Sequence, residues 1–210
     1  LLADSKVYDG TTTVTLRGVP TIDGLLTGDS SSISGSVNAA FSNANAGTAV
    51  AVSTNLIELS ISNSNYYIAG ILNPLTANIT PAPLTVTADS KTMVYGSTLP
   101  TLTYQYTGLV SSDTSASFTG LLSTTASSSA AAGGNYSVTQ GTLAATGNYR
   151  ITSFNAGIVT INQRPVTVSI NAGQTKVYGN SDPSSFNLTI QEQGTDVGLL
   201  TGTTLNGGPA

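Results

Sequence analysis

The sequence lacks cysteine, histidine and tryptophan, and only 8% of its 210 residues are charged. Soluble domains usually carry about 25% charged residues, so serine, threonine, asparagine and glycine must keep this surface hydrated. Without histidine and cysteine the chain has no side chain that titrates near neutrality and no thiolate nucleophile, and it also lacks the usual transition-metal ligands. A conventional hydrolase triad therefore cannot be assembled, and we expect no enzymatic activity.

Charge and hydrophobicity exclude three further classes. The six basic residues lie far apart in a chain of net charge −4, whereas nucleic-acid binding needs clustered cations. No apolar run reaches the roughly 18 residues that cross a bilayer. Hydrophobic residues make up 39% of the chain, which is too many for a disordered segment. We expect a folded protein with neither nucleic-acid binding nor membrane insertion.

An internal repeat is the strongest signal in the sequence. Lys6-Val7-Tyr8-Asp9-Gly10 recurs as Val94-Tyr95-Gly96 and again as Lys176-Val177-Tyr178-Gly179. A second marker, Asn65-Tyr66, recurs as Asn148-Tyr149 in step with the first. The period is 83 to 87 residues, which is the size of a small domain.

This period predicts modules at residues 1–80, 81–163 and 164–210, the third cut after about half its length. Such a chain is typical of a fragment of a longer protein. The joints carry Pro81, Pro83 and Pro165, and proline fixes φ, so we expect stiff joints and an elongated rod.

Short alternating runs such as Leu84-Thr85-Val86-Thr87-Ala88 and Ile158-Val159-Thr160-Ile161 predict β-strands. The expected fold class is all-β, with tandem small antiparallel β modules, preferably of sandwich type. A β-grasp-like second module is expected from one possible helical turn at residues 112–117. A continuous parallel β-helix is disfavoured because its coils repeat every 20 to 30 residues.

Taken as an ordered set, these motifs resemble repeat modules of large bacterial haemagglutinin-like adhesins. Residues 1–80, with Lys6-Val7-Tyr8-Asp9-Gly10-Thr11-Thr12 and Asn65-Tyr66, resemble the YDG type. Residues 81–163, with Val94-Tyr95-Gly96 and Asn148-Tyr149-Arg150-Ile151, resemble the glycine-rich MBG type, which residues 164–210 restart.

The resemblance implies a non-enzymatic segment of an exported bacterial adhesin, often of the two-partner or another type V secretion kind. It implies an extracellular, outer-membrane-associated location and a role in cell adhesion and biofilms as stalk or adhesion surface. The implied partners are neighbouring modules of the same chain and a possible glycan or host-surface protein. The alternative is a carbohydrate- or host-protein-binding module in its own right.

Tyrosines and glycines of the first marker have two interpretations. Tyr8, Tyr95 and Tyr178 are either sugar-stacking platforms or core and joint tyrosines, and the second reading is favoured because a valine precedes and a turn follows each. The glycines that complete these turns are expected to need unusual φ values: Gly10, Gly96 and Gly179.

Carboxylates and lysines give only minor hypotheses. Calcium is the most plausible ion, with Asp9, Asp29, Asp113 and Asp182 near the markers and the pairs Asp4 with Asp9 or Asp23 with Asp29 near a joint, but no dense acidic loop exists. Lys6, Lys91 and Lys176 raise the idea of isopeptide crosslinks without an identifiable partner. Glu58 and Glu192 are the only glutamates for a glycosidase pair. We therefore assign no catalytic, cofactor-binding or metal-binding residue and no cofactor.

Overall fold

The computed structural model describes residues 1–55, 58–70, 74–170, 175–181, 185–192 and 204–206. These residues form β-strands and turns without a helix, which confirms the all-β class. The turn expected at residues 112–117 is therefore not helical, and the reason for a β-grasp-like second module is lost. In the described ranges there is accordingly no helix that could cross a membrane.

Residues 1–80, 81–163 and 164–210 are called here the first, second and third repeat. The chain forms two compact units, which do not coincide with the repeats. The first unit contains residues 1–89, 102–124 and 138–157, and the second contains residues 90–101, 125–137 and 158–210. All of the first repeat thus packs with part of the second in one compact unit.

The first repeat is organised around a four-stranded sheet in the order β2-β8-β6-β5. Two small ribbons, β1–β3 and β4–β7, complete it. Its strands are β1 (Leu2–Ala3), β2 (Lys6–Val7), β3 (Leu16–Arg17), β4 (Ile33–Ser34), β5 (Asn38–Phe41), β6 (Gly47–Asn55), β7 (Ser60–Ile61) and β8 (Leu75–Thr80).

In the second repeat, β9 lies between β11 and β16 within the first unit. The pair β12–β15 belongs to the same unit, while β10 pairs with β17 in the second unit. The strands are β9 (Ala82–Ala88), β10 (Lys91–Val94), β11 (Tyr104–Thr107), β12 (Ser117–Thr119), β13 (Ser123–Thr124), β14 (Asn135–Thr139), β15 (Ala144–Thr146), β16 (Tyr149–Asn155) and β17 (Gly157–Asn162).

The third repeat contributes an antiparallel sheet to the second unit, in the order β18-β19-β20. Its strands are β18 (Val166–Ile170), β19 (Ser185–Glu192) and β20 (Thr204–Asn206).

The expectation of antiparallel modules is wrong for three strand pairs. β2 runs parallel to β8, β16 to β9, and β10 to β17. Each parallel pair joins strands about 70 residues apart, because the chain crosses the whole repeat before the later strand returns beside the earlier one. The sheets are therefore mixed.

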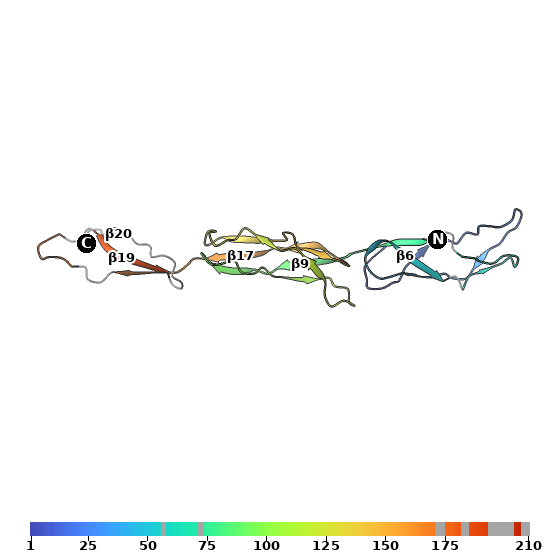
Figure 1. Ribbon diagram of the computed structural model, residues 1–210, viewed down its shortest axis with the longest axis horizontal. Helices are drawn as coiled ribbons and strands as arrows, with labels where there is room; N and C mark the ends of the chain where they lie inside the picture. Colours follow the sequence, from blue (N-terminus) through green and yellow to red (C-terminus); the bar gives the residue numbers. More distant parts are fainter. Residues whose placement is uncertain (56–57, 71–73, 171–174, 182–184, 193–203, 207–210) are drawn as a thin grey trace. The chain divides into compact units, whose positions relative to one another are not determined.

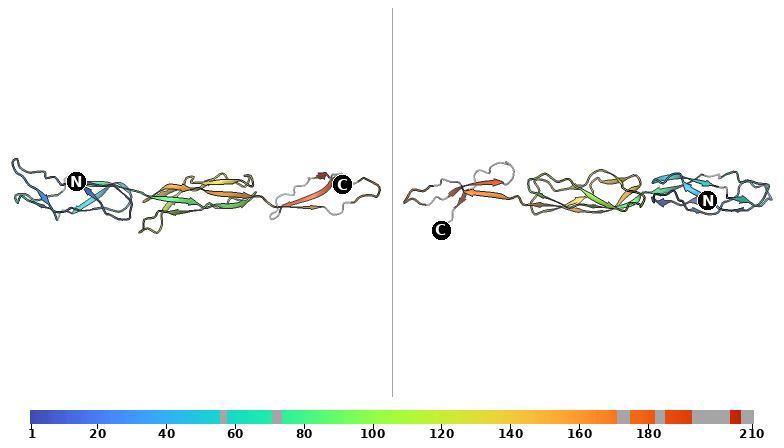
Figure 2. Two further views of the ribbon diagram at one scale, coloured as in Figure 1. Left: turned by 180° about the vertical axis from the view of Figure 1, so that it is seen from behind. Right: turned by 90° about the horizontal axis from the view of Figure 1, so that it is seen from below.

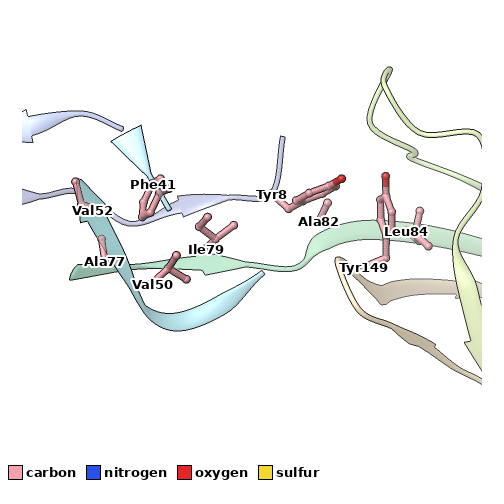
Figure 3. Packing of buried hydrophobic residues seen from close by; sticks show 9 residues of the cluster. All are labelled: Tyr8, Phe41, Val50, Val52, Ala77, Ile79, Ala82, Leu84 and Tyr149. Carbon is pink, nitrogen blue, oxygen red and sulfur yellow. The ribbon is translucent and has the colours of Figure 1, made fainter. Parts of the chain in front are cut away.

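The largest core runs across the boundary between the first two repeats. Alternation buries Ala77 and Ile79 of β8, and on the other side of Pro81 it buries Ala82 and Leu84 of β9. Figure 3 shows these side chains in one line of packed residues, with Ile79 and Leu84 almost fully buried. The cluster consists of Tyr8, Phe41, Val50, Val52, Ala77, Ile79, Ala82, Leu84 and Tyr149.

Candidate functional site

The joint between the first and second repeats is one nearly continuous extended stretch of chain. β8 ends at Thr80 and β9 begins at Ala82, so only Pro81 separates them. Figures 1 and 2 show the chain running extended into β9 from the strand before it. The Thr80 carbonyl accepts from the Tyr8 N–H at 2.8 Å, and the Ala82 N–H donates to the Asn148 carbonyl at 2.8 Å. Neighbouring residues of this stretch are thus fixed on one side to the first repeat and on the other to the second.

Three polar side chains meet beside this stretch. The Tyr8 hydroxyl donates to Asp113 Oδ2 at 3.0 Å, and the Tyr149 hydroxyl donates to the same oxygen at 2.5 Å. The two rings pack edge to face, with centroids 5.6 Å apart and an interplanar angle of 77°. Both rings are buried, and Figure 3 shows their hydroxyls pointing to the same side. Asp113 of the second repeat therefore ties a tyrosine from each repeat to one carboxylate.

A short loop of the second repeat positions this carboxylate. The Val110 N–H donates to the Tyr149 hydroxyl at 3.1 Å, so that hydroxyl both accepts from the loop and donates to it. The Asp113 N–H donates to the Val110 carbonyl at 2.9 Å and closes a turn. The loop and Tyr149 therefore hold each other in place without Tyr8. We call the arrangement of Val110, Asp113 and Tyr149 the tyrosine clamp.

The Tyr8-Asp9-Gly10 turn fits against the clamp from the first repeat. Gly10 has φ +77°, and a Cβ atom there would come within 2.4 Å of Ser112 Oγ and 3.5 Å of Val110 Cγ1. Asp9 accepts from Lys6 Nζ at 2.7 Å and from the Thr11 N–H at 2.9 Å, which stabilises the turn. Glycine is therefore required for conformation and for close approach to the second repeat.

A second set of contacts braces the joint through amide side chains. The Asn148 side chain accepts from the Ala46 N–H at 2.9 Å and donates to Asn45 Oδ1 at 3.1 Å. Its backbone carbonyl binds Ala82, as described above. Asn148 thus forms hydrogen bonds both to the loop before β6 and to the first residue of β9.

The joint changes the pKa values of its three ionisable groups. Hydrogen bonds, first from Tyr149 and then from Tyr8, hold the pKa of the Asp113 carboxyl below its ordinary value, although burial acts in the opposite direction. Burial raises the pKa of Tyr8 and that of Tyr149, and the Asp113 carboxylate raises both further. The arrangement favours a charged Asp113 beside two neutral phenols.

These shifts predict a stability plateau with a loss on each side. Because the Asp113 pKa is lower in the folded state, its contribution is complete above its ordinary value of about 3.9 and is lost as the pH falls through the folded value. The tyrosine contribution is complete below about pH 10 and is lost as the pH rises through the raised values. Urea midpoints measured from pH 2 to 11 should show both losses. In Asp113→Asn the urea midpoint should fall less steeply as the pH is lowered. A fall as steep as in the unchanged protein would contradict this assignment.

The first repeat contains a second tyrosine clamp at Tyr66. The Leu26 N–H donates to the Tyr66 hydroxyl at 3.0 Å, and that hydroxyl donates to Asp29 Oδ2 at 2.6 Å. The Asp29 N–H donates to the Leu26 carbonyl at 3.0 Å, as Asp113 does to Val110. The hydrogen bond to Asp29 raises the pKa of Tyr66. Asp29 and Asp113 are 84 positions apart, so the clamp follows the repeat period.

The three tyrosines of the first marker differ in how exposed they are in the structure. The core or joint interpretation is confirmed for Tyr8, which is buried, whereas Tyr95 is about half-exposed and Tyr178 fully exposed. The Tyr95 N–H donates to the Asn162 carbonyl at 2.9 Å, as Tyr8 does to Thr80. The positive φ values expected for the glycines that follow are confirmed: Gly10, Gly96 and Gly179.

The calcium candidates bind other groups. Asp4 accepts from Arg17 Nε at 2.6 Å and Asp9 from Lys6, while Asp29 and Asp113 belong to the clamps. Asp23 caps its own turn at the Gly24 N–H, and Asp182 lies outside the described residues. Among the residues that are described, no three acidic side chains gather as a metal site would require.

Other candidates are not brought together as a site. Lys6 Nζ donates to Asp9 Oδ1 and to the Thr11 carbonyl, each at 2.7 Å, and lies 5.5 Å from the centre of the Phe41 ring. The Glu58 carboxylate accepts from the Ser36 hydroxyl at 2.5 Å, and the Glu192 side chain is not among the described ones.

Sequence reasoning missed the pairing of each aspartate with the later Asn-Tyr marker. Gly24-Leu25-Leu26 precedes Asp29, and Gly108-Leu109-Val110 precedes Asp113, each with the aspartate five positions after the glycine. A search for pairs of motifs recurring at the same separation would have linked these loops to Tyr66 and Tyr149.

The fold and the joint define a tandem of small all-β repeat domains that share a core across their boundary. A family model of the YDG domain matches residues 1–73, and one of the MBG domain (YGX type) matches residues 84–160. Residues 1–73 are therefore similar to a YDG domain and residues 84–160 to an MBG domain of the YGX type, two domain types found in adhesin-like repeat proteins, and these two segments are called here the YDG domain and the MBG domain. Comparison with curated proteins and with solved structures gave no match.

Proposed function

We propose that this chain is a non-enzymatic spacer of an exported bacterial adhesin, in which stiffly stacked domains carry a binding region away from the cell. The observation that carries the proposal is the shared core at the YDG–MBG joint, closed by Tyr8, Asp113 and Tyr149. A core that continues across a domain boundary resists bending, because bending would expose apolar surface and break hydrogen bonds to a charged group.

The polar surface fits the same role. A spacer must stay hydrated along its whole length, and hydroxyl and amide side chains do this without large charge repulsion. Export by type V secretion and attachment at the outer membrane belong to this proposal, as do the absence of enzymatic activity and of a bound cofactor.

A spacer and a binding module differ in measurable ways. Small-angle scattering of the chain should give a radius of gyration well above the roughly 17 Å of a single compact domain of this length. Tyr8→Phe removes only the hydroxyl that bonds Asp113 and should broaden the distance distribution between spin labels placed in the two domains. A compact particle, or a distribution that Tyr8→Phe leaves as narrow as before, would contradict the stiff spacer.

The alternative function is binding of a glycan or a host-surface protein. One feature favours it: a hollow of about 420 Å³ beside the joint, lined by polar groups that include Ser115, Thr146 and Asn148. The aromatic faces of Tyr8 and Tyr149 are buried, so they are not open for sugar stacking. A glycan array and a pull-down with host-surface extract decide this point. Saturable binding would favour the binding module, whereas an absence of binding in both assays would favour the spacer.

A further inference from the structure

The second clamp, at Tyr66 and Asp29, has the geometry of the clamp at the joint but is not covered in the same way. Val110 is half-buried and packs against the core shared by the two repeats, and Gly10 of the first repeat lies beside it. Its counterpart Leu26 is 72% exposed, and Asp29 is exposed as well. The carboxylate of Asp113 accepts from two phenols, whereas the hydrogen bonds described for Asp29 include one phenol, that of Tyr66.

We propose that Leu26, Asp29 and Tyr66 form a docking surface for the tyrosine–glycine turn of another repeat of this kind. The incoming tyrosine would donate its hydroxyl to Asp29 and set its ring edge to face against Tyr66, as Tyr8 does at Asp113 and Tyr149. The incoming glycine would lie against Leu26, as Gly10 lies near Val110. The turn Tyr8-Asp9-Gly10 has the required chemistry.

Three requirements select this partner. The acceptor is a carboxylate, so the partner must present a donor such as a phenol. The neighbouring ring favours an aromatic side chain over an aliphatic hydroxyl. The turn that presents the tyrosine needs glycine for its own backbone, as Gly10 does with φ +77° at the known joint. A tyrosine–glycine turn of a repeat meets all three.

Strand register allows a direct test. Asp4 and Asp89 are equivalent, because the Asp4 N–H donates to the Thr15 carbonyl and the Asp89 N–H to the Thr103 carbonyl, both at 2.9 Å. Placing a copy of residues 1–85 directly ahead of Leu1 therefore rebuilds a strand of the length of β9, which ends at Ala3 and is followed by Asp4. In this extended chain, the tyrosine at position 8 of the added copy should face Asp29.

The test is a double-mutant cycle on thermal unfolding of the extended chain. The added copy should raise the unfolding temperature of the original YDG domain by about 4 °C or more. Tyr→Phe at position 8 of the added copy, and Asp29→Asn in the original one, should each remove part of this gain, and together no more than the larger single loss. Asp29→Asn in the unextended chain gives the baseline for its effect on the domain itself.

Asp23→Asn is the matched control. Asp23 lies in the same loop and accepts only from the N–H of the adjacent Gly24 among its described contacts, so its loss should leave the gain intact. Strictly additive losses, or a gain that survives Asp29→Asn, would overturn the proposal. The inference rests on stacking of repeats as proposed above, but this cycle measures one contact and can fail while scattering still shows a rod.

Discussion

Tyr149→Ala is expected to lower the free energy of unfolding by about 3–5 kcal/mol, the usual cost of removing a large buried aromatic side chain. The Tyr149 ring is only 4% exposed and packs against Tyr8 in the shared core. Its loss also removes the acceptor of the Val110 N–H and a donor to Asp113. Chemical denaturation followed by circular dichroism gives the measurement.

Two variants separate the contributions of ring and hydroxyl. Tyr149→Phe keeps the ring and should lose only the smaller share that comes from the hydrogen bonds. Tyr67→Ala removes a tyrosine that is 84% exposed, so it should change stability by no more than about 0.5 kcal/mol. If Tyr149→Ala cost no more than Tyr67→Ala, the core would not extend through the joint as described.

Tyr149→Ala also tests whether the two domains unfold together. Tyr149 belongs to a cluster that contains Phe41 and Ile79 of the first repeat. Hydrogen exchange of β8 amides should therefore speed up in Tyr149→Ala, although the changed residue lies in the MBG domain. Unchanged protection of β8 would mean that the domains unfold independently.

Much of the fold could be predicted because strands of this chain carry clear local signals. In β9, Ala82, Leu84, Val86 and Ala88 alternate with exposed or half-buried positions, so period two reports the core face directly. Parallel pairing could not be predicted in this way. It depends on which distant strand returns beside β9, and alternation is the same for either direction.

The residues of the site could be predicted from the sequence, but their contacts could not, for a related reason. The repeat markers drew attention to Tyr8 and Tyr149, but composition gave no cause to place them together. The sequence places Asp113 near a marker and makes it a calcium candidate, whereas its partners in the structure are two phenols. A hydrogen bond between residues 105 positions apart depends on tertiary packing, and one sequence without an alignment carries no direct record of it.

Gly108→Ala is expected to cost about 2–5 kcal/mol, because two effects add at this position. Gly108 begins the clamp loop with φ +107°, a conformation that L side chains rarely adopt. A Cβ atom there would also lie 2.7 Å from the Pro83 carbonyl oxygen of β9, which is too close for the backbone to stay in place. The loop should shift away from β9, and the unfolding free energy of the variant measures the cost.

Gly24→Ala is the matched control for this prediction. Gly24 holds the same place in the clamp loop of the YDG domain and has φ +94°, but a Cβ atom would meet nothing within 4 Å. Only the conformational cost of about 1–3 kcal/mol should remain. The difference between the two variants isolates the close contact between the clamp loop and β9. Equal costs would show that the loop at Gly108 moves away from β9 without loss of stability. The tyrosine clamp would then not be held against β9.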